Sequence, residues 1–209
     1  MTVQIIQCEQ GTLEWYEARR GIPTASEFAS IMSKGRGTAE SKMRRTYMNK
    51  LAAEIVTGDL TEHVSTYDME RGKTMEDEAR KLYAFMTDSE PERVGFIRNG
   101  NVGASPDSLL GSTAGLEIKT KTPHLQIEVL RCDVLPDEHK AQVLGSLWVT
   151  EREWWDFVSY WPTLPIFIKR VYRDEKYIKE LASAVSQFND ELGQVVETIR
   201  KYGSLQEAA

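Results

Sequence analysis

The chain has 209 residues, of which 41% are hydrophobic and 28% are charged, and its formal net charge is −6 at neutral pH. This composition is ordinary for a single soluble globular domain and excludes a protein coated in basic surface. It does not exclude nucleic acid as a partner, because the distribution of charge decides that question. No stretch approaches the roughly 18 uninterrupted apolar residues of a membrane-spanning helix, so no membrane partner is expected.

The cysteines and the N-terminus indicate a compartment. Cys8 and Cys132 are the two cysteines, and their spacing is not that of a metal site. The first residues lack the basic and apolar regions of a signal peptide. We therefore expect a reduced, cytoplasmic setting.

The N-terminal part of the chain predicts a candidate phosphate site. Residues 12–20 are expected to form a helix, and the sequence Thr-Ala-Ser-Glu at 24–27 is the pattern of a capping box that opens a second helix. The start of a helix presents free N–H groups and the positive end of the helix dipole, which attract a phosphate. Arg19 and Ser26 bracket this start. A plain surface cation is an equally good interpretation of Arg19.

Helical and strand patterns alternate along the rest of the chain. The spacing of apolar residues predicts helices at residues 41–57, 67–87, 136–147 and about 174–202. Runs of β-branched, aromatic and other apolar residues predict strands at 93–98, 101–105, 116–119, 154–160 and 166–172, whereas residues 124–135 fit either structure. We expect one α/β domain over residues 1–209, with a small mixed central sheet flanked by helices and a long C-terminal helix.

One stretch carries the chemistry. Asp107 precedes a turn at residues 111–115, and Glu117 and Lys119 follow that turn on a predicted strand. Residues two apart on a strand project from the same face, so Glu117 and Lys119 lie together while Ile118 points into the core. The turn lets the chain fold back and place Asp107 beside Glu117. Two carboxylates so close repel each other unless a divalent cation lies between them.

A few oxygen ligands of this kind suit Mg²⁺ that retains several waters. The lysine would then orient or help to deprotonate the water that attacks a phosphodiester. Each part also has an ordinary interpretation, because Glu-x-Lys is common on solvated strands and Ser-Pro-Asp is a common turn. In this order, with flanking apolar residues, they form the pattern of the PD-(D/E)xK nuclease superfamily.

Glu76 lies in an acidic run, and such runs are usually solvated, but Glu76 borders the buried side of its predicted helix and could face the metal site.

Motifs that occur together in one protein family lie in four segments, within residues 15–27, 71–80, 105–119 and 141–160. Together these segments resemble the phage lambda-type exonucleases, the alkaline exonucleases of viral recombination. The resemblance spans about residues 15 to 162, in the order and at the spacing of that family, and implies a restriction-endonuclease-like core. Two departures concern the catalytic block. Ser108 stands where glycine is usual after the aspartate, and residues 120–123 (Thr-Lys-Thr-Pro) replace a common Cys-Pro. A third is Leu144, where a second glutamine is frequent.

The resemblance implies a role for each matched residue. Asp107, Glu117 and the Ile118 carbonyl would bind a metal ion, Glu76 would act at a second ion, and Lys119 would act on the attacking water. The pocket for the 5′-terminal phosphate would comprise Arg19, Ser26, Ser105 and Gln142. Two further positions match DNA contacts, Arg36 in a loop and Met69 near the point of strand separation.

The implied activity is a Mg²⁺-dependent 5′-to-3′ exonuclease with two ions, for which Mn²⁺ can substitute. It would degrade one strand of double-stranded DNA from a free 5′ end and leave a 3′ single strand for recombination. Family members form ring-shaped homotrimers around the duplex, act processively and often work with a single-strand annealing protein, here in the cytoplasm of a bacterial host. Two other functions stay open: another nuclease on the same core, such as a site-specific endonuclease or junction resolvase, and a recombination mediator that binds DNA without cutting it.

Overall fold

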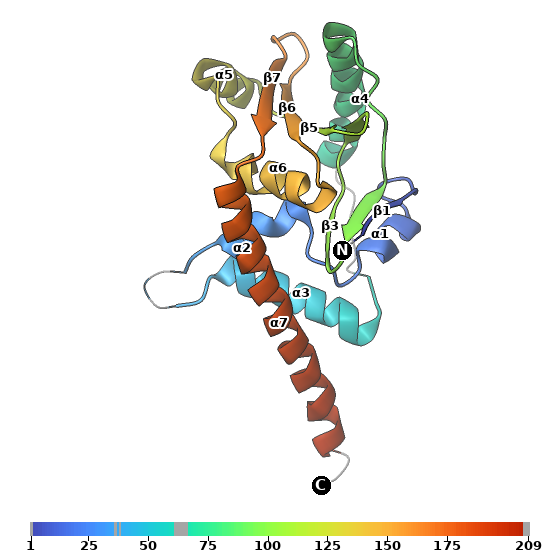
Figure 1. Ribbon diagram of the computed structural model, residues 1–209, viewed down its shortest axis with the longest axis vertical. Helices are drawn as coiled ribbons and strands as arrows, with labels where there is room; N and C mark the ends of the chain where they lie inside the picture. Colours follow the sequence, from blue (N-terminus) through green and yellow to red (C-terminus); the bar gives the residue numbers. More distant parts are fainter. Residues whose placement is uncertain (1, 36, 38, 61–66, 207–209) are drawn as a thin grey trace.

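The computed structural model describes residues 2–35, 37, 39–60 and 67–206, and it contains two β-sheets with helices packed around them (Figure 1). The strands are β1 (Val3–Ile6), β2 (Phe96–Asn99), β3 (Val102–Ala104), β4 (Ser108–Leu110), β5 (Ala114–Thr120), β6 (Trp154–Tyr160) and β7 (Phe167–Tyr172). The helices are α1 (Leu13–Arg19), the 3₁₀ helix η1 (Ala25–Glu27), α2 (Phe28–Met32), α3 (Lys42–Thr57), α4 (Tyr67–Thr87), α5 (Pro123–Cys132), α6 (Asp137–Thr150) and α7 (Glu175–Gln206). The α/β class predicted from the sequence is confirmed.

The larger sheet is mixed and has the strand order β4-β5-β6-β7. Strands β5 and β6 are parallel, and α5 and α6 lie in the chain between them, whereas the other neighbouring pairs are antiparallel. Ser108 at the start of β4 pairs with Leu116 of β5. This register brings Asp107, one residue earlier, next to Glu117, as the predicted reversal of the chain requires.

A second, smaller sheet was not predicted as a separate unit. It has the order β1-β2-β3, and both of its pairs are antiparallel. Strand β1 has only four residues, of which two are exposed, so it lacks the apolar alternation that identifies a strand. The turn between β2 and β3 contains Gly100 with a φ of 62°, a left-handed conformation that glycine adopts without strain.

Helix α6 lies at the centre of the packing and contacts the smaller sheet, η1, α2, α7 and β6. Gly145 allows a close approach to α2, because a Cβ atom there would lie 2.4 Å from the ring of Phe28. Phe28 itself is fully buried. Any larger residue at position 145 would therefore push α6 away from α2.

Helix α7 is longer than predicted and continues through Gly203 to Gln206. An interior glycine costs a helix only about 1 kcal/mol, so it need not end one. The first part of α7 is packed on the core, whereas Ile199 and Tyr202 are exposed, and Figure 1 shows the C-terminal part extending beyond α3. The buried stripe comprises Ile178, Leu181, Val185, Phe188, Leu192 and Val196.

Other expectations are corrected or resolved by the structure. Residues 124–135 are mostly helical, in α5, which Pro123 begins. The helical spacing of apolar residues places Met43 and Met86 on the apolar faces of their helices, but both lie near the ends of those helices and are exposed by 59% and 56%. In the described part of the chain, no helix has both the length and the apolarity needed to cross a bilayer.

Candidate active site

Strand β5 presents Glu117 and Lys119 on one face, as its period of two predicts. The Lys119 Nζ atom lies 2.7 Å from Glu117 Oε1. Ile118 is buried in an apolar cluster that includes Leu116. Burial alone would lower the pKa of Lys119, but the nearby carboxylates of Glu117, Asp107 and Glu76 outweigh it and raise that pKa. Lys119 is therefore an ammonium ion at neutral pH.

Asp107, in the segment before β4, lies close to Glu117 and Lys119, as the sequence predicts. Its Oδ2 atom accepts a hydrogen bond of 2.5 Å from the backbone N–H of Ile118. Burial raises the pKa of the Asp107 carboxyl well above its usual range, and the negative charges of Glu117 and Glu76 raise it further. The three predicted carboxylates are thus close enough to repel one another, which is the electrostatic situation that a bound cation relieves.

Glu117 is 2% exposed, and its two oxygen atoms differ in their surroundings. Oε1 accepts hydrogen bonds from Lys119 and from Gln142 Nε2, the latter at 2.5 Å. Oε2 is buried and has no hydrogen-bond partner among the described residues. A buried carboxylate oxygen without a donor is costly unless an ion or water satisfies it. Gln142, predicted for the phosphate pocket, instead contacts this carboxylate from α6.

The residues present fit a divalent cation that keeps part of its water shell. Asp107 and Glu117 would supply two hard oxygen ligands, and Mg²⁺ commonly binds through only one or two carboxylates. Among the described residues, no group of three or more acidic, histidine or cysteine side chains is arranged to hold a metal ion. Among the described residues, Glu117 Oε2 is a buried oxygen without a hydrogen-bond partner, whereas Asp107 Oδ2 accepts from the N–H of Ile118.

Glu76 lies on α4 and borders a cleft of about 560 Å³ that Asp107 also lines. Its Oε1 atom accepts a short hydrogen bond from Arg80 Nη2. Arg80 also binds Asp77, with 2.7 Å between Nη1 and Oδ1. Arg80 was not predicted as a site residue, although the spacing of four residues between Glu76 and Arg80 is the usual signal of a helical ion pair.

Arg19 and Ser105 lie together, as predicted for the phosphate pocket. Arg19 Nη1 donates to Ser105 Oγ at 2.7 Å, and the guanidinium carbon lies 4.0 Å from the centre of the Trp15 ring. Trp15 Nε1 also donates to Ser105 Oγ, at 3.0 Å. Trp15 therefore holds both residues in place, a role that the sequence pattern did not reveal.

The predicted capping box is wrong. Thr24 makes no side-chain cap, and its Oγ1 atom instead lies 3.5 Å from Arg19 Nη2 and 3.2 Å from Ser26 Oγ. The segment that follows is the 3₁₀ helix η1, so the expected α-helical N-terminus is absent there. The Thr24 hydroxyl thus contacts both Arg19 and Ser26 and connects the two predicted pocket residues. Arg36 lies outside the described residues, and Met69 lies in α4 with a side chain outside the described part.

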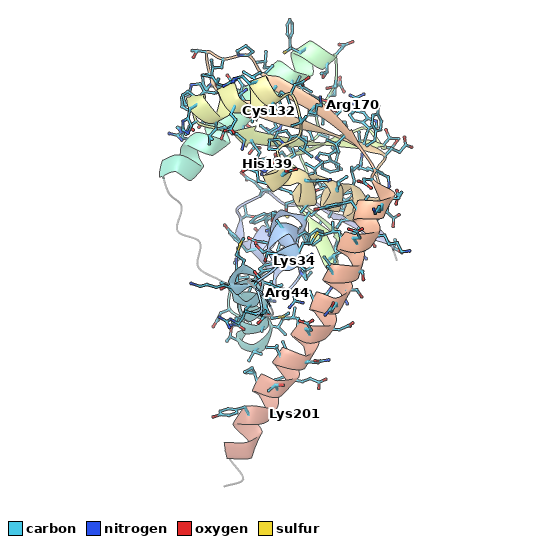
Figure 2. All side chains as sticks on the ribbon, turned by 90° about the vertical axis from the view of Figure 1, so that its left-hand side faces the viewer. Lys34, Arg44, Cys132, His139, Arg170 and Lys201 are labelled. Atoms are coloured by element: carbon cyan, nitrogen blue, oxygen red, sulfur yellow. The ribbon has the colours of Figure 1, made fainter. Side chains whose placement is uncertain are left out.

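A second charged cluster surrounds Lys121, where the chain departs from the family pattern. Lys121 Nζ lies 2.6 Å from Glu138 Oε1 and 3.0 Å from His139 Nε2. His139 stacks on Phe157 and lies on the sheet side of the molecule (Figure 2). Burial, together with the charges of Lys121 and Lys119, lowers the pKa of His139 to about 4, so this histidine is neutral at neutral pH.

Comparisons with known proteins identify the family and the fold of the chain. Residues 14–153 match the family described as the YqaJ-like viral recombinase domain. The alkaline exonuclease LHK-Exo from Laribacter hongkongensis is 32% identical, with a TM-score of 0.83 over 93% of this chain and 100% of that chain. LHK-Exo in complex with dAMP is 35% identical, with a TM-score of 0.84 over 93% and 100% of the two chains.

A more distant structure shares the fold. The phage-related exonuclease from Haemophilus somnus 129PT is 14% identical, with a TM-score of 0.63 over 85% of this chain and 96% of that one. A search of curated proteins gave no match. The family model covers most of the chain and LHK-Exo matches at full length, so the predicted family and enzyme class, a deoxyribonuclease, are confirmed. The chain belongs to the YqaJ-like viral recombinase family and shares the fold of the alkaline exonucleases of lambda type.

Proposed function

We propose that this protein is a Mg²⁺-dependent exonuclease that degrades one strand of linear double-stranded DNA from its 5′ end. The product is a 3′ single-stranded overhang, the substrate of recombination by single-strand annealing. The observation that carries the proposal is the Glu117 carboxylate, which is buried beside Asp107 and Lys119 and has one oxygen without a hydrogen-bond partner in the described part of the chain. Burying a charged carboxylate in this way costs free energy that packing does not return, which indicates a functional role.

Each residue of the site has a physical task in hydrolysis. Asp107 and Glu117 would hold the cation, and Glu76 would face a second one across the cleft. When bound, the ions neutralise the negative charge that develops on the phosphate oxygens. Lys119, held as an ammonium ion by Glu117, can donate a hydrogen bond to the attacking water and fix its direction. Gln142 keeps the Glu117 carboxylate in one orientation.

The polarity of digestion would come from the pocket of Arg19, Ser26 and Ser105. A terminal phosphate carries more negative charge than an internal one, and the guanidinium of Arg19 has a planar fork of donors for it. The contacts of Arg19 with Trp15 and Ser105 fix that fork before DNA binds. The complex of the relative LHK-Exo with dAMP is consistent with a site that accepts a nucleotide with a 5′-phosphate.

We propose further that three copies form a ring around the duplex and that the protein works with a single-strand annealing partner. A chain with a net charge of −6 cannot stay on DNA through general electrostatic attraction, whereas a ring can stay on by enclosure. Light scattering is expected to give a trimer, and a DNA trap added after binding should leave long runs of digestion intact. A monomer that is released after each nucleotide would contradict the ring.

The direct test uses linear duplexes labelled at the 5′ or the 3′ end, incubated with Mg²⁺ or with EDTA. We expect release of the 5′ label as mononucleotide, retention of the 3′ label on shortened strands, and no reaction in EDTA. Covalently closed circular DNA serves as the control substrate and should stay intact. Cleavage of the circle would indicate an endonuclease, and DNA binding without hydrolysis would indicate a mediator.

A further inference from the structure

Arg80 is a buried cation that joins two elements of the active site. Its side chain is 10% exposed, and its hydrogen bonds to described residues go to α4, to Asp107 and to Ser108 at the start of β4. On α4 it binds the carboxylates of Glu76 and Asp77. Across the gap, Nε donates to Ser108 Oγ at 2.9 Å and Nη2 donates to the backbone carbonyl of Asp107 at 3.3 Å. One nitrogen, Nη2, thus contacts both Glu76 and the main chain of Asp107.

Ser108 closes the same link from the other side. It is fully buried, and its hydroxyl donates to the Asp107 carbonyl at 2.6 Å while it accepts from Arg80 Nε. The Asp107 carbonyl therefore receives one hydrogen bond from Ser108 and one from Arg80. Glycine, which the family usually has at this position, offers no side-chain hydroxyl for this connection.

The hydrogen bonds of Arg80 and Ser108 hold the main chain of Asp107 at its backbone carbonyl. The Asp107 side chain is held by the N–H of Ile118, and its main chain is held by Ser108 and Arg80. The guanidinium is planar and presents its donors in a fixed fork, so the direction of one contact determines that of the others. A lysine keeps the positive charge but cannot reach these acceptors with one rigid group.

We propose that Arg80 and Ser108 are a pair of positioning residues that fix Glu76 relative to Asp107. The inference rests on the proposed function, because the separation of these two carboxylates matters only if they bind cations. Ligands held in place before the cation arrives bind it more tightly, since less ordering is required on binding. Ser108 would thus supply in this chain a connection that glycine does not.

The test uses Ser108→Ala and Arg80→Lys, both of which keep the charge of the site unchanged. Changes in metal affinity then report on position and not on electrostatic attraction. Ser146→Ala is the matched control for a buried serine, since Ser146 is 2% exposed and lies in α6. Arg44→Lys is the matched control for a partly buried arginine with two carboxylate partners, Glu40 and Glu191, and Figure 2 shows Arg44 on the helical part of the molecule, apart from His139 at the sheet.

Binding of Mn²⁺ is measured by isothermal titration calorimetry without DNA, and digestion is measured separately. We expect each of the two test variants to bind Mn²⁺ about tenfold more weakly, as mutations of residues that orient ligands do. The kcat should fall with KM for DNA unchanged, and the double variant should lose little more than Arg80→Lys alone. The controls should bind Mn²⁺ as the wild type does.

Unchanged Mn²⁺ binding by the folded test variants would overturn the proposal, as would an equal loss in the controls. The thermal midpoint of each variant shows whether it folds. If Ser108→Ala does not fold, the test depends on Arg80→Lys, in which Ser108 is intact. A wild-type protein that binds no Mn²⁺ would contradict the metal-dependent function itself. If the wild type binds Mn²⁺ and the test variants bind it equally well, only the proposed positioning roles of Arg80 and Ser108 are contradicted.

Discussion

Replacement of Glu117 by glutamine is expected to reduce the turnover of DNA by about a thousandfold or more, because it removes one charge from a site whose members act as a unit. Asp107→Asn and Lys119→Gln should be as severe, and Glu76→Gln less so. The glutamine keeps the shape of the side chain and can still contact Gln142. Digestion of end-labelled duplex under single-turnover conditions measures the loss.

Stability provides the control for this prediction. Glu117→Gln removes the repulsion with Asp107 and also the ion pair with Lys119, so the two effects oppose each other and the thermal midpoint without divalent ions should change little. Glu180→Gln, at an exposed position on α7, should leave both turnover and midpoint unchanged. Near wild-type turnover by Glu117→Gln would refute the assignment of the site.

A duplex with a 5′-phosphate is expected to be digested faster than the same duplex with a 5′-hydroxyl, by about 10- to 100-fold at low enzyme concentration. The estimate follows from about 1.5–3 kcal/mol for a hydrogen bond to a charged group, since 1.4 kcal/mol corresponds to a factor of ten. Arg19→Ala should erase most of this preference by slowing digestion of the phosphorylated duplex. Arg19→Lys should retain only part of it, because the fork is lost.

The neighbouring arginine offers a close control. Arg20 is exposed, and its Nη1 atom donates to the carbonyl of Gly58, away from Ser105. Arg20→Ala changes the net charge by the same amount as Arg19→Ala, so it should keep the preference for the phosphorylated end. Equal wild-type rates on the two ends would show that the pocket is misassigned, even if the nuclease survives.

The sequence predicted those parts of the site that depend on local geometry. The strand period is sufficient to place Glu117 beside Lys119, and a short turn is sufficient to return the chain to Asp107. The pairing of Ser108 with Leu116 agrees with both expectations.

The strand period and turn patterns do not predict contacts that depend on how the elements pack together. Gln142 was expected at the phosphate pocket, but the packing of α6 on the sheet brings it to Glu117. The Thr24 hydroxyl was expected to cap a helix, but Arg19 and Ser26 contact it instead. Glu117 is 25 residues from Gln142 in the sequence, and Arg19 lies outside the 24–27 motif, so the tertiary structure and not the local pattern sets these contacts.

Helix α6 joins the candidate metal site to the candidate phosphate pocket. It contacts Glu117 through Gln142, and three residues later Gly145 packs against Phe28 and Ala25, of which Ala25 directly precedes Ser26. Under the proposed function, this one helix would set the distance between the anchored 5′ end and the cleaved bond. A distance fixed by the protein would give products of uniform size at every cycle, whatever the base sequence.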